Sequence, residues 1–263
     1  MHIQYYDIGL NLFTRSFPDP EKIIADAEAA GIRCILTGSE SRDNEQVNAF
    51  TKTHDLYGTA GIHPHCTDTA KEEDIARIRE IIQSNPRIVA VGETGLDYDH
   101  MYAKKENQLR FFKKLIDLAE ELKKPMFLHE RDAAEDFIRC FEGHDELCRR
   151  SVVHCYTGDR ATLEKLLDMG FYIGITGWIC DERRGDDLRD AVKILPLDRV
   201  MVETDAPYLT PRGFRLPRTN VPQNIVYVAE TLARYMGVSQ EKLEKAAREN
   251  TEKLFRISGQ EEK

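Results

Sequence analysis

Short apolar runs alternate with longer amphipathic segments along the whole chain. The runs are rich in β-branched residues, and most are continuously apolar, which is typical of strands buried on both faces. Eight runs fit this description, at residues 5–10, 33–36, 57–62, 88–91, 126–128, 152–153, 172–175 and 200–202. Each of them predicts a buried strand of a parallel sheet.

The segments between the runs have helical patterns and residues typical of helix ends. Asp19 followed by Pro20 predicts a helix start, and Gly31 predicts its stop. Thr69 and Glu72 have the spacing of a capping box. Further helix starts are predicted at Asp159, Asn220 and Ser239. One longer helix is predicted to share an apolar face made of Leu109, Phe112, Leu115, Ile116, Ala119 and Leu122.

Eight strand–helix units in a chain of 263 residues predict an α/β protein with a closed parallel sheet. We expect a single domain over residues 1–263, a (β/α)8 TIM barrel, rather than a doubly wound open sheet. No linker and no low-complexity tract interrupts the pattern.

Composition and charge narrow the class of protein. Hydrophobic residues make up 41% and charged residues 32%, and neither a signal peptide nor a membrane-spanning run is recognisable, so we expect a cytoplasmic protein without a membrane partner. Six cysteines without a Cys-x-x-Cys pair argue against a thiolate zinc site. The net charge of −9 opposes sequence-blind binding to long duplexes, so a nucleic-acid substrate would have to be held by local arginines and metal.

Ionisable residues collect where the predicted strands end. They lie in residues 61–65, 92–97, 128–132, 153–156 and 202–207. In a parallel barrel these positions converge on one rim, where two imidazoles and two carboxylates make a mixed nitrogen and oxygen site for zinc, manganese or magnesium. Taken singly, each residue also fits a satisfied structural histidine or a solvated acid. The combination on several strand ends carries the signal.

The same motifs resemble a known family. Residues 61–65 (GIHPH), 92–97 (GETGLD), 128–132 (LHERD), 154–158 (HCYTG) and 203–209 (ETDAPYL) resemble, in order and over nearly the whole chain, the serial motifs of the TatD family of metal-dependent deoxyribonucleases. Residues 172–178 and 181–185 are similar to the bacterial TatD branch of this family.

The resemblance implies a fold, an activity and a set of ligands. It implies a barrel of the amidohydrolase type, a divalent metal, and hydrolysis of phosphodiester bonds. The bacterial branch acts as a magnesium-dependent 3′-to-5′ exonuclease on single-stranded DNA and RNA and is linked to repair of oxidative DNA damage. By the same resemblance, Glu93, His129 and His154 are expected to be metal ligands, and Asp205 a catalytic carboxylate that contacts metal or the nucleophilic water.

Two positions depart from the family pattern. Many members carry a His-x-His pair after the first strand that completes a second metal position, whereas this chain has Gly9, Leu10 and Asn11 there. A permanently occupied two-metal site is therefore in doubt. Residues 220–222 read Asn-Val-Pro, where relatives usually have Asn-Glu-Pro.

Histidines near the predicted site have candidate roles in the reaction. We hypothesise in-line attack on a phosphodiester by water that the metal activates and Asp205 orients or deprotonates. His63 is a candidate catalytic residue at the scissile phosphate or leaving group, and His65 a candidate substrate contact; the alternative is a structural turn fixed by Pro64. The remaining histidines, predicted to lie at the surface, are His2, His54, His100 and His144.

Arginines and one tryptophan are candidate substrate-binding residues. Arg131, Arg183 and Arg184 follow strand ends and can clamp phosphates through their planar guanidinium groups. Trp178 can stack on a terminal base, and packing at the rim is the alternative. A basic loop after the last strand adds Arg212, Arg215 and Arg218. For these arginines the alternative is a solvated charged surface.

Two other functions remain open at this point. The same barrel can hydrolyse another ester or an amide, because fold does not settle substrate. A non-catalytic protein that binds metal or nucleic acid is the second alternative, favoured by the missing His-x-His pair. The arginines favour a phosphate-bearing substrate. The resemblance implies that this substrate is single-stranded DNA or RNA and that the metal is Mg²⁺, with Mn²⁺ or Zn²⁺ as alternatives. We expect a monomer.

Overall fold

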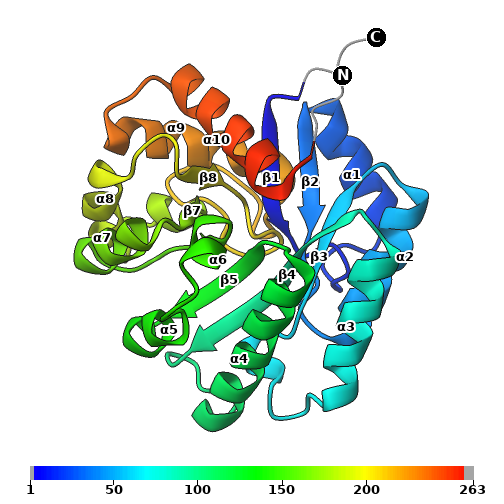
Figure 1. Cartoon of the computed structure of the whole chain (residues 1–263). Helices are drawn as coiled ribbons and strands as arrows, with labels where there is room; N and C mark the ends of the chain where they lie inside the picture. The colour runs from blue at the N-terminus through cyan, green and yellow to red at the C-terminus, as the bar shows by residue number, and fades with distance from the viewer. Residues whose placement is uncertain (1–2, 258–263) are drawn as a thin grey trace. The chain divides into compact units, whose positions relative to one another are not determined.

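The structure is a computed structural model that describes residues 3–257. Eight strands form one sheet in chain order, with parallel pairing between neighbours such as β3 and β4 or β4 and β5. The strands are β1 (Tyr5–Leu10), β2 (Ile32–Leu36), β3 (Tyr57–Ala60), β4 (Ile88–Asp97), β5 (Met126–Arg131), β6 (Val152–His154), β7 (Tyr172–Ile175) and β8 (Val200–Val202). Leu10 bridges Ala206 in parallel, which joins the ends of β1 and β8. The (β/α)8 barrel class is confirmed (Figure 1).

Helices follow the strands as the alternating pattern predicts. The α-helices are α1 (Pro20–Ala29), α2 (Ser41–Thr53), α3 (Glu72–Ser84), α4 (Lys105–Leu122), α5 (Ala134–Cys140), α6 (Asp145–Arg149), α7 (Arg160–Met169), α8 (Asp186–Ala191), α9 (Ile225–Met236) and α10 (Gln240–Phe255). Short 3₁₀ helices are η1 (Pro64–Cys66), η2 (Gly177–Cys180), η3 (Val192–Ile194) and η4 (Pro222–Asn224). Within residues 3–257, no helix combines the length and apolarity that crossing a bilayer requires.

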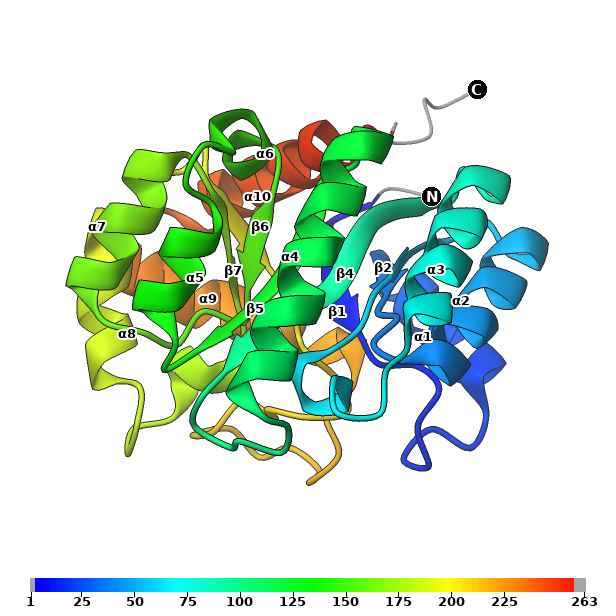
Figure 2. The same cartoon turned by 60° about the horizontal axis from the view of Figure 1, so that its bottom comes forward.

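The chain packs as two compact units. Of the described residues, the first contains those up to Ile35, then Cys155–Asp168 and those from Tyr172 to Ile257; the second contains Leu36–His154 and Met169–Phe171. In the second unit, α4 packs along β4 (Figure 2). The apolar interior of the second unit includes four phenylalanines whose rings contact one another: Phe112, Phe137, Phe141 and Phe171. The prediction of a single domain over residues 1–263 stays a prediction.

Most predicted helix starts are confirmed, and two are wrong. Asp19 caps α1, and Ser239 caps α10, each accepting a backbone N–H three residues on. The start of α3 uses Asp74, whose carboxylate accepts the backbone N–H of Lys71, rather than Thr69 and Glu72. Asn220 caps no helix, because its amide is used in tertiary hydrogen bonds to backbone carbonyls of the segment after β8.

Strand ends differ from the sequence pattern most at β4. The apolar run predicts residues 88–91, but the strand continues for ten residues to Asp97. Its second half contains Glu93, Thr94 and Asp97, all buried. These polar residues interrupt the apolar sequence pattern, but the pairing of β4 with β5 continues through them. Gly95 pairs with His129, and Asp97 pairs with Arg131. Polar residues therefore lie inside the sheet, where the sequence pattern predicted only a strand end.

Candidate metal centre

Strand β4 of the second unit carries two buried carboxylates. Glu93 and Asp97 are four residues apart in extended chain, where alternate side chains point to the same side. Glu93 is 6% exposed and Asp97 is 1% exposed. The backbone N–H of Glu93 donates to the carbonyl of Gly38 at 2.7 Å. The strand and this hydrogen bond hold both acids in defined positions.

Three imidazoles converge on Oε1 of Glu93. Nε2 of His154 lies 2.8 Å from this oxygen, Nδ1 of His129 lies 3.2 Å away and Nε2 of His63 lies 3.3 Å away. Burial alone would raise the pKa of the Glu93 carboxyl, but the charges and hydrogen bonds of the imidazoles outweigh it and hold that pKa well below its usual range. Glu93 is therefore an ionised carboxylate at neutral pH.

His129, in β5, lies between the two carboxylates. Its Nδ1 faces Glu93, and its Nε2 lies 3.2 Å from Oδ2 of Asp97. Burial lowers the pKa of this imidazole, but its hydrogen bonds with Asp97 and Glu93 raise the pKa overall. When the Nε2 proton is donated to Asp97, Nδ1 is the nitrogen left to bind a cation beside Glu93, which is the arrangement of a metal-ligating histidine backed by a carboxylate.

His154 ends β6 and completes the group. His129 and His154 are register partners on neighbouring strands, so their side chains project from the same row of the sheet. The ring of Phe127 stacks on the His154 imidazole with centroids 4.3 Å apart. His154 is 3% exposed, and its Nε2 is directed at Glu93 by this packing.

His63, which precedes η1, has a different protonation pattern. Its Nδ1 accepts the backbone N–H of His65 at 3.1 Å. Burial lowers the pKa of His63 to about 4, despite the opposing charge of Glu93, so the ring is neutral at pH 7. A neutral imidazole has one N–H and one lone pair, so acceptance at Nδ1 places the proton on Nε2. His63 is therefore a hydrogen-bond donor toward Glu93 rather than a ligand in this arrangement.

The donor set fits a divalent cation. Among the described residues, His63, Glu93 and His129 offer ligand atoms that lie within 4.8 Å of one another, and His154 faces the same oxygen of Glu93. One carboxylate oxygen and two imidazole lone pairs, from Glu93, His129 and His154, are ligands that zinc and manganese accept, and such a set leaves positions for water or substrate. The predicted trio of ligands thus lies together in the second unit.

Asp205, the fourth predicted ligand, lies in the first unit after β8. Its Oδ1 accepts from Nδ2 of Asn11 at 2.9 Å, so the asparagine that stands at the departure from His-x-His binds this carboxylate. The backbone N–H of Thr204 donates to Oδ1 of the buried Asp7 at 2.8 Å. The Asp205 backbone has a φ of +55°. The role of Asp205 at the metal stays a prediction.

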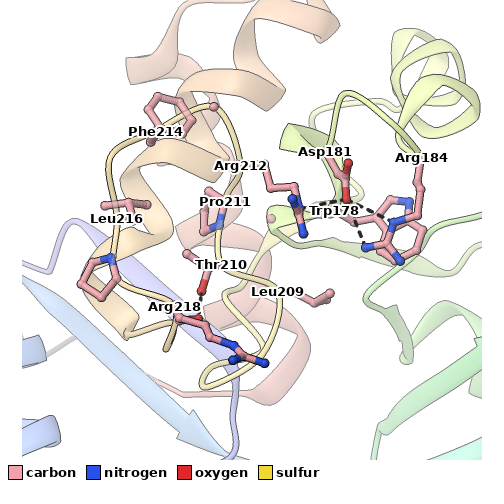
Figure 3. Close-up of a pocket in the computed structure, with 13 residues that line it drawn as sticks. Trp178, Asp181, Arg184, Leu209, Thr210, Pro211, Arg212, Phe214, Leu216 and Arg218 are labelled. Atoms are coloured by element: carbon pink, nitrogen blue, oxygen red, sulfur yellow. Dashed lines mark hydrogen bonds and ion pairs between the residues drawn. The ribbon is translucent and has the colours of Figure 1, made fainter.

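A pocket of about 470 Å³ lies in the first unit, between η2 and the segment after β8 (Figure 3). Arginine side chains crowd one buried carboxylate at its edge: Arg183, Arg184 and Arg212 lie 3.0, 3.1 and 3.2 Å from Oδ2 of Asp181. One negative charge against three positive charges leaves a cationic edge. The pocket lining also includes Trp178, Leu209, Thr210, Pro211, Phe214, Leu216 and Arg218.

The side chains predicted to contact the substrate are each packed against or paired with another residue. Trp178 is 9% exposed, and the guanidinium carbon of Arg184 lies 4.0 Å from the centroid of its ring, so the structure shows packing at this tryptophan. In the second unit, Nη2 of Arg131 lies 3.4 Å from the Asp99 carboxylate. Nε2 of His65 lies 2.7 Å from Oδ2 of Asp97. Contact of these residues with a substrate stays a prediction.

The sequence analysis gave no role to Asp97 or His100. His100 is exposed, as predicted, and its Nδ1 lies 3.2 Å from Oδ2 of Asp97. The signal for Asp97 was present: a strand that extends past Glu93 brings the residue four positions later to the same face. His54 and His144 are half-buried, and His2 lies outside the described residues.

Comparisons with known proteins show the family of this chain. A family profile described as TatD related DNase matches residues 6–256. A protein of Erwinia amylovora named 3′-5′ ssDNA/RNA exonuclease TatD is 38% identical over 257 residues, which cover 95% of this chain and 99% of that protein. A protein of the same name from Escherichia fergusonii is 37% identical over 262 residues, covering 96% and 99% of the two chains.

Solved structures show the same fold. The crystal structure of a TatD homologue from Escherichia coli matches with a TM-score of 0.89 and 26% identity, over 98% of this chain and all of that chain (100%). A TatD family hydrolase from Entamoeba histolytica matches with a TM-score of 0.87 at 23% identity, over 98% and 100% of the chains.

Proposed function

Because this chain belongs to the TatD related DNase family, we propose that it is a metal-dependent nuclease that acts as a 3′-5′ exonuclease on single-stranded DNA and RNA. The observation that supports this proposal best is the convergence of His129, His154 and His63 on one oxygen of Glu93. The family and its relatives indicate the class of reaction. The group of Glu93 and its three histidines is a suitable binding site for the metal that this reaction needs.

We propose Glu93, His129 and His154 as the metal ligands and Mg²⁺ as the working ion, with Mn²⁺ and Zn²⁺ as ions that suit the two imidazoles. A divalent cation bound there lowers the pKa of a water and offsets charge on a phosphoryl oxygen. Asp97 holds His129 in the tautomer that presents Nδ1 to the cation. Asp97 is thus a positioning residue for this site.

The other predicted site residues have proposed roles toward the substrate or the attacking water. His63 is neutral with its proton on Nε2, so it can donate a hydrogen bond to a phosphoryl oxygen without carrying charge into the buried site. Asp205, as a carboxylate, orients or deprotonates the attacking water. His65 and Arg131, both in the second unit, contact the nucleic-acid substrate. Substitution of each residue tests its role.

The pocket of the first unit suits a nucleic-acid strand. Its cationic edge of Arg184 and Arg212 complements phosphates, and its apolar lining, with Trp178 at one wall, suits a base or sugar. The overall charge of −9 means that attraction to a polyanion depends on such local cations. Arg183, paired with the same Asp181, adds to this edge.

Cleavage of a short single-stranded oligonucleotide tests the proposal. The oligonucleotide is labelled at each end in turn and incubated with Mg²⁺, Mn²⁺ or EDTA. Wild type is compared with His154→Ala and Asp205→Ala, and with His144→Ala, a half-buried histidine outside the cluster, as the matched control. Metal-dependent shortening from the 3′ end, retained in His144→Ala, is expected. Loss of a ligand should lower the rate by more than the roughly 10–100-fold that loss of an outer-shell partner costs.

No cleavage with any metal would refute the nuclease proposal, and equal cleavage by wild type and His154→Ala would refute the metal assignment. If no oligonucleotide is cleaved but a carboxylic ester or an amide is hydrolysed, the protein would instead be a hydrolase of another substrate. The single domain, a monomeric state, a cytoplasmic location and a role in repair of oxidative DNA damage stay predictions.

A further inference from the structure

A second group of imidazoles surrounds Asp97, on the other side of His129. Oδ2 of Asp97 lies 2.7 Å from Nε2 of His65, 3.2 Å from Nδ1 of His100 and 3.2 Å from Nε2 of His129. Oδ1 of the same carboxylate accepts the backbone N–H of His100 at 2.9 Å. The carboxylate is 1% exposed, whereas the side chains of His65 and His100 are 28% and 48% exposed.

Three imidazole nitrogens on one oxygen exceed what hydrogen bonding can satisfy. A carboxylate oxygen has two lone pairs in its plane, so it accepts two well-directed N–H groups. His129 uses one of them through its Nε2. His65 and His100 then share the remaining lone pair. A cation that takes this lone pair together with one ring nitrogen of each histidine satisfies all three groups.

The group has the same construction as the centre around Glu93. Each consists of one buried carboxylate oxygen with three imidazole nitrogens within 3.3 Å, and His129 belongs to both. Among the described residues, His65, Asp97 and His100 also offer three ligand atoms within 4.8 Å of one another, as His63, Glu93 and His129 do.

The segment that carries His100 is held in place by the protein. The buried side chain of Gln108, in α4, accepts the backbone N–H of Asp97 at 2.8 Å. Its amide nitrogen donates to the carbonyls of Asp97 and Ala103, each at 3.0 Å. Gln108 thus ties together both ends of the segment. The site does not have to be assembled from a loose loop.

Tyr102 packs against both histidine rings. Its ring stacks on His100 with centroids 5.5 Å apart and meets the edge of His65 at 4.7 Å. These contacts limit ring rotation and keep Nδ1 of His100 and Nε2 of His65 directed at Asp97. The 48% exposure of His100 leaves an open side on which water can complete a coordination shell.

We propose that His65, Asp97 and His100 form a second binding site, for a divalent transition-metal ion. Two imidazole nitrogens and one carboxylate oxygen are ligands that zinc, cobalt and manganese accept. Its proposed ligands are other residues than those of the His-x-His position, where the chain has Gly9, Leu10 and Asn11. It gives the chain a second ion on β4 and the segment after it, and it does not depend on the nature of the substrate.

Zinc binding to the full chain tests the proposal. Protein stripped with a chelator is dialysed against rising Zn²⁺, and bound zinc is counted by elemental analysis. Wild type is expected to bind two ions per chain. His100→Ala and His65→Ala are each expected to bind one, with the affinity of the second ion weakened by more than about 100-fold. His144→Ala, whose histidine contacts Glu120 outside both groups, is the matched control and should bind two.

A second measurement separates the two ions. Imidazole nitrogen signals in NMR spectra should shift for His154 with one ion and for His65 and His100 with the other. His154→Ala should lose the first set of shifts and keep the second. A wild-type protein that binds one ion, a His100→Ala variant that still binds two, or unshifted His65 and His100 signals at saturation would overturn the proposal. None of these readouts requires cleavage of a nucleic acid, so failure of the nuclease proposal would be recognised separately.

Discussion

Nε2 of His129 lies 3.2 Å from Oδ2 of Asp97, while the other nitrogen of the same ring faces Glu93. One imidazole thus joins the two carboxylates of β4. The consequence is that the protonation of His129 is set by Asp97, because the carboxylate that accepts the Nε2 proton leaves the Nδ1 lone pair available to a cation. The proposed metal binding at Glu93 would therefore depend on Asp97, which is not one of the proposed ligands.

Replacing Asp97 should weaken the first metal site without removing a ligand from it. In Asp97→Ala, His129 loses the partner that fixes its tautomer, and the metal concentration needed for half-maximal activity should rise by about 10–100-fold. Saturating metal should restore much of the activity. The measurement is oligonucleotide cleavage as a function of Mn²⁺ concentration. Asp117→Ala, which removes an exposed acid of α4, is the control, and an unchanged metal requirement in Asp97→Ala would contradict the positioning role.

Gly95 is expected to tolerate no side chain. Its φ is +151°, and a Cβ at this position would meet the backbone carbonyl of His129 in β5. Gly95→Ala should therefore lower the free energy of unfolding by about 4 kcal/mol or more, or prevent folding. Gly143→Ala is the matched control, since Gly143 also has a positive φ but a Cβ added there would meet nothing within 4 Å. Its cost should be of order 1 kcal/mol.

Thermal and urea unfolding measure both glycine variants. Similar losses in Gly95→Ala and Gly143→Ala would show that the backbone angle alone, and not the close approach of β4 to β5, accounts for the glycine.

The hydrogen bond between Asn11 and Asp205 predicts a graded effect on activity. Loss of a hydrogen bond to a charged group costs about 1.5–3 kcal/mol, so Asn11→Ala should lower kcat/KM by about 10–100-fold if Asp205 acts in the reaction. Asn11→Asp should be worse, because it puts a carboxylate oxygen in place of the amide nitrogen that lies 2.9 Å from Oδ1 of Asp205, so two like charges would face each other. Steady-state kinetics on a labelled oligonucleotide measure both. Wild-type kinetics in Asn11→Asp would argue against a role for Asp205.

Asp7 should make stability fall as pH rises toward neutrality. Burial raises the pKa of Asp7 to about 7, although its hydrogen bonds from Thr204 oppose this. Between about pH 4 and pH 7 the folded protein therefore keeps a proton that the unfolded chain has released. Because the folded state binds more protons there, its stability decreases with rising pH, by about 1.4 kcal/mol per pH unit, and levels off above the folded pKa.

The variant Asp7→Asn isolates this contribution from that of the histidines. Urea unfolding of wild type and variant from pH 5 to pH 8 should give a difference in unfolding free energy that falls up to about pH 7 and is flat above it. Parallel curves for the two proteins across the whole range would mean that Asp7 does not titrate in this window.

The order of elements was predictable because each strand of a parallel sheet is buried on both faces. The runs at residues 5–10, 172–175 and 200–202 coincide with β1, β7 and β8. Where the pattern failed, at β4, the reason is chemical. Glu93 and Asp97 are buried among other polar groups, and a hydropathy pattern treats such carboxylates as exposed.

Glu93, His129 and His154 could be predicted from motifs at strand ends, and the structure brings them together. Asn220 was expected to start a helix, but its amide binds the carbonyls of Thr204 and Tyr208, a choice that depends on the segment after β8 rather than on the residues that follow Asn220. Asp97 and His100 were given no role from the sequence, since their contacts arise only once β4 is extended and the following segment is tied to Gln108.

The sequence by itself determined the barrel class, the family and which residues form the first group of proposed ligands, because these depend on periodicity and on short motifs carried within single strand–helix units. Only the tertiary structure decided which nitrogen of each histidine faces which oxygen. That property depends on the register of β4 with β5 and of β5 with β6, and on the packing of Phe127 and Tyr102 against the rings. Tautomers and ligand directions are set by neighbours in space, which no local pattern of residues specifies.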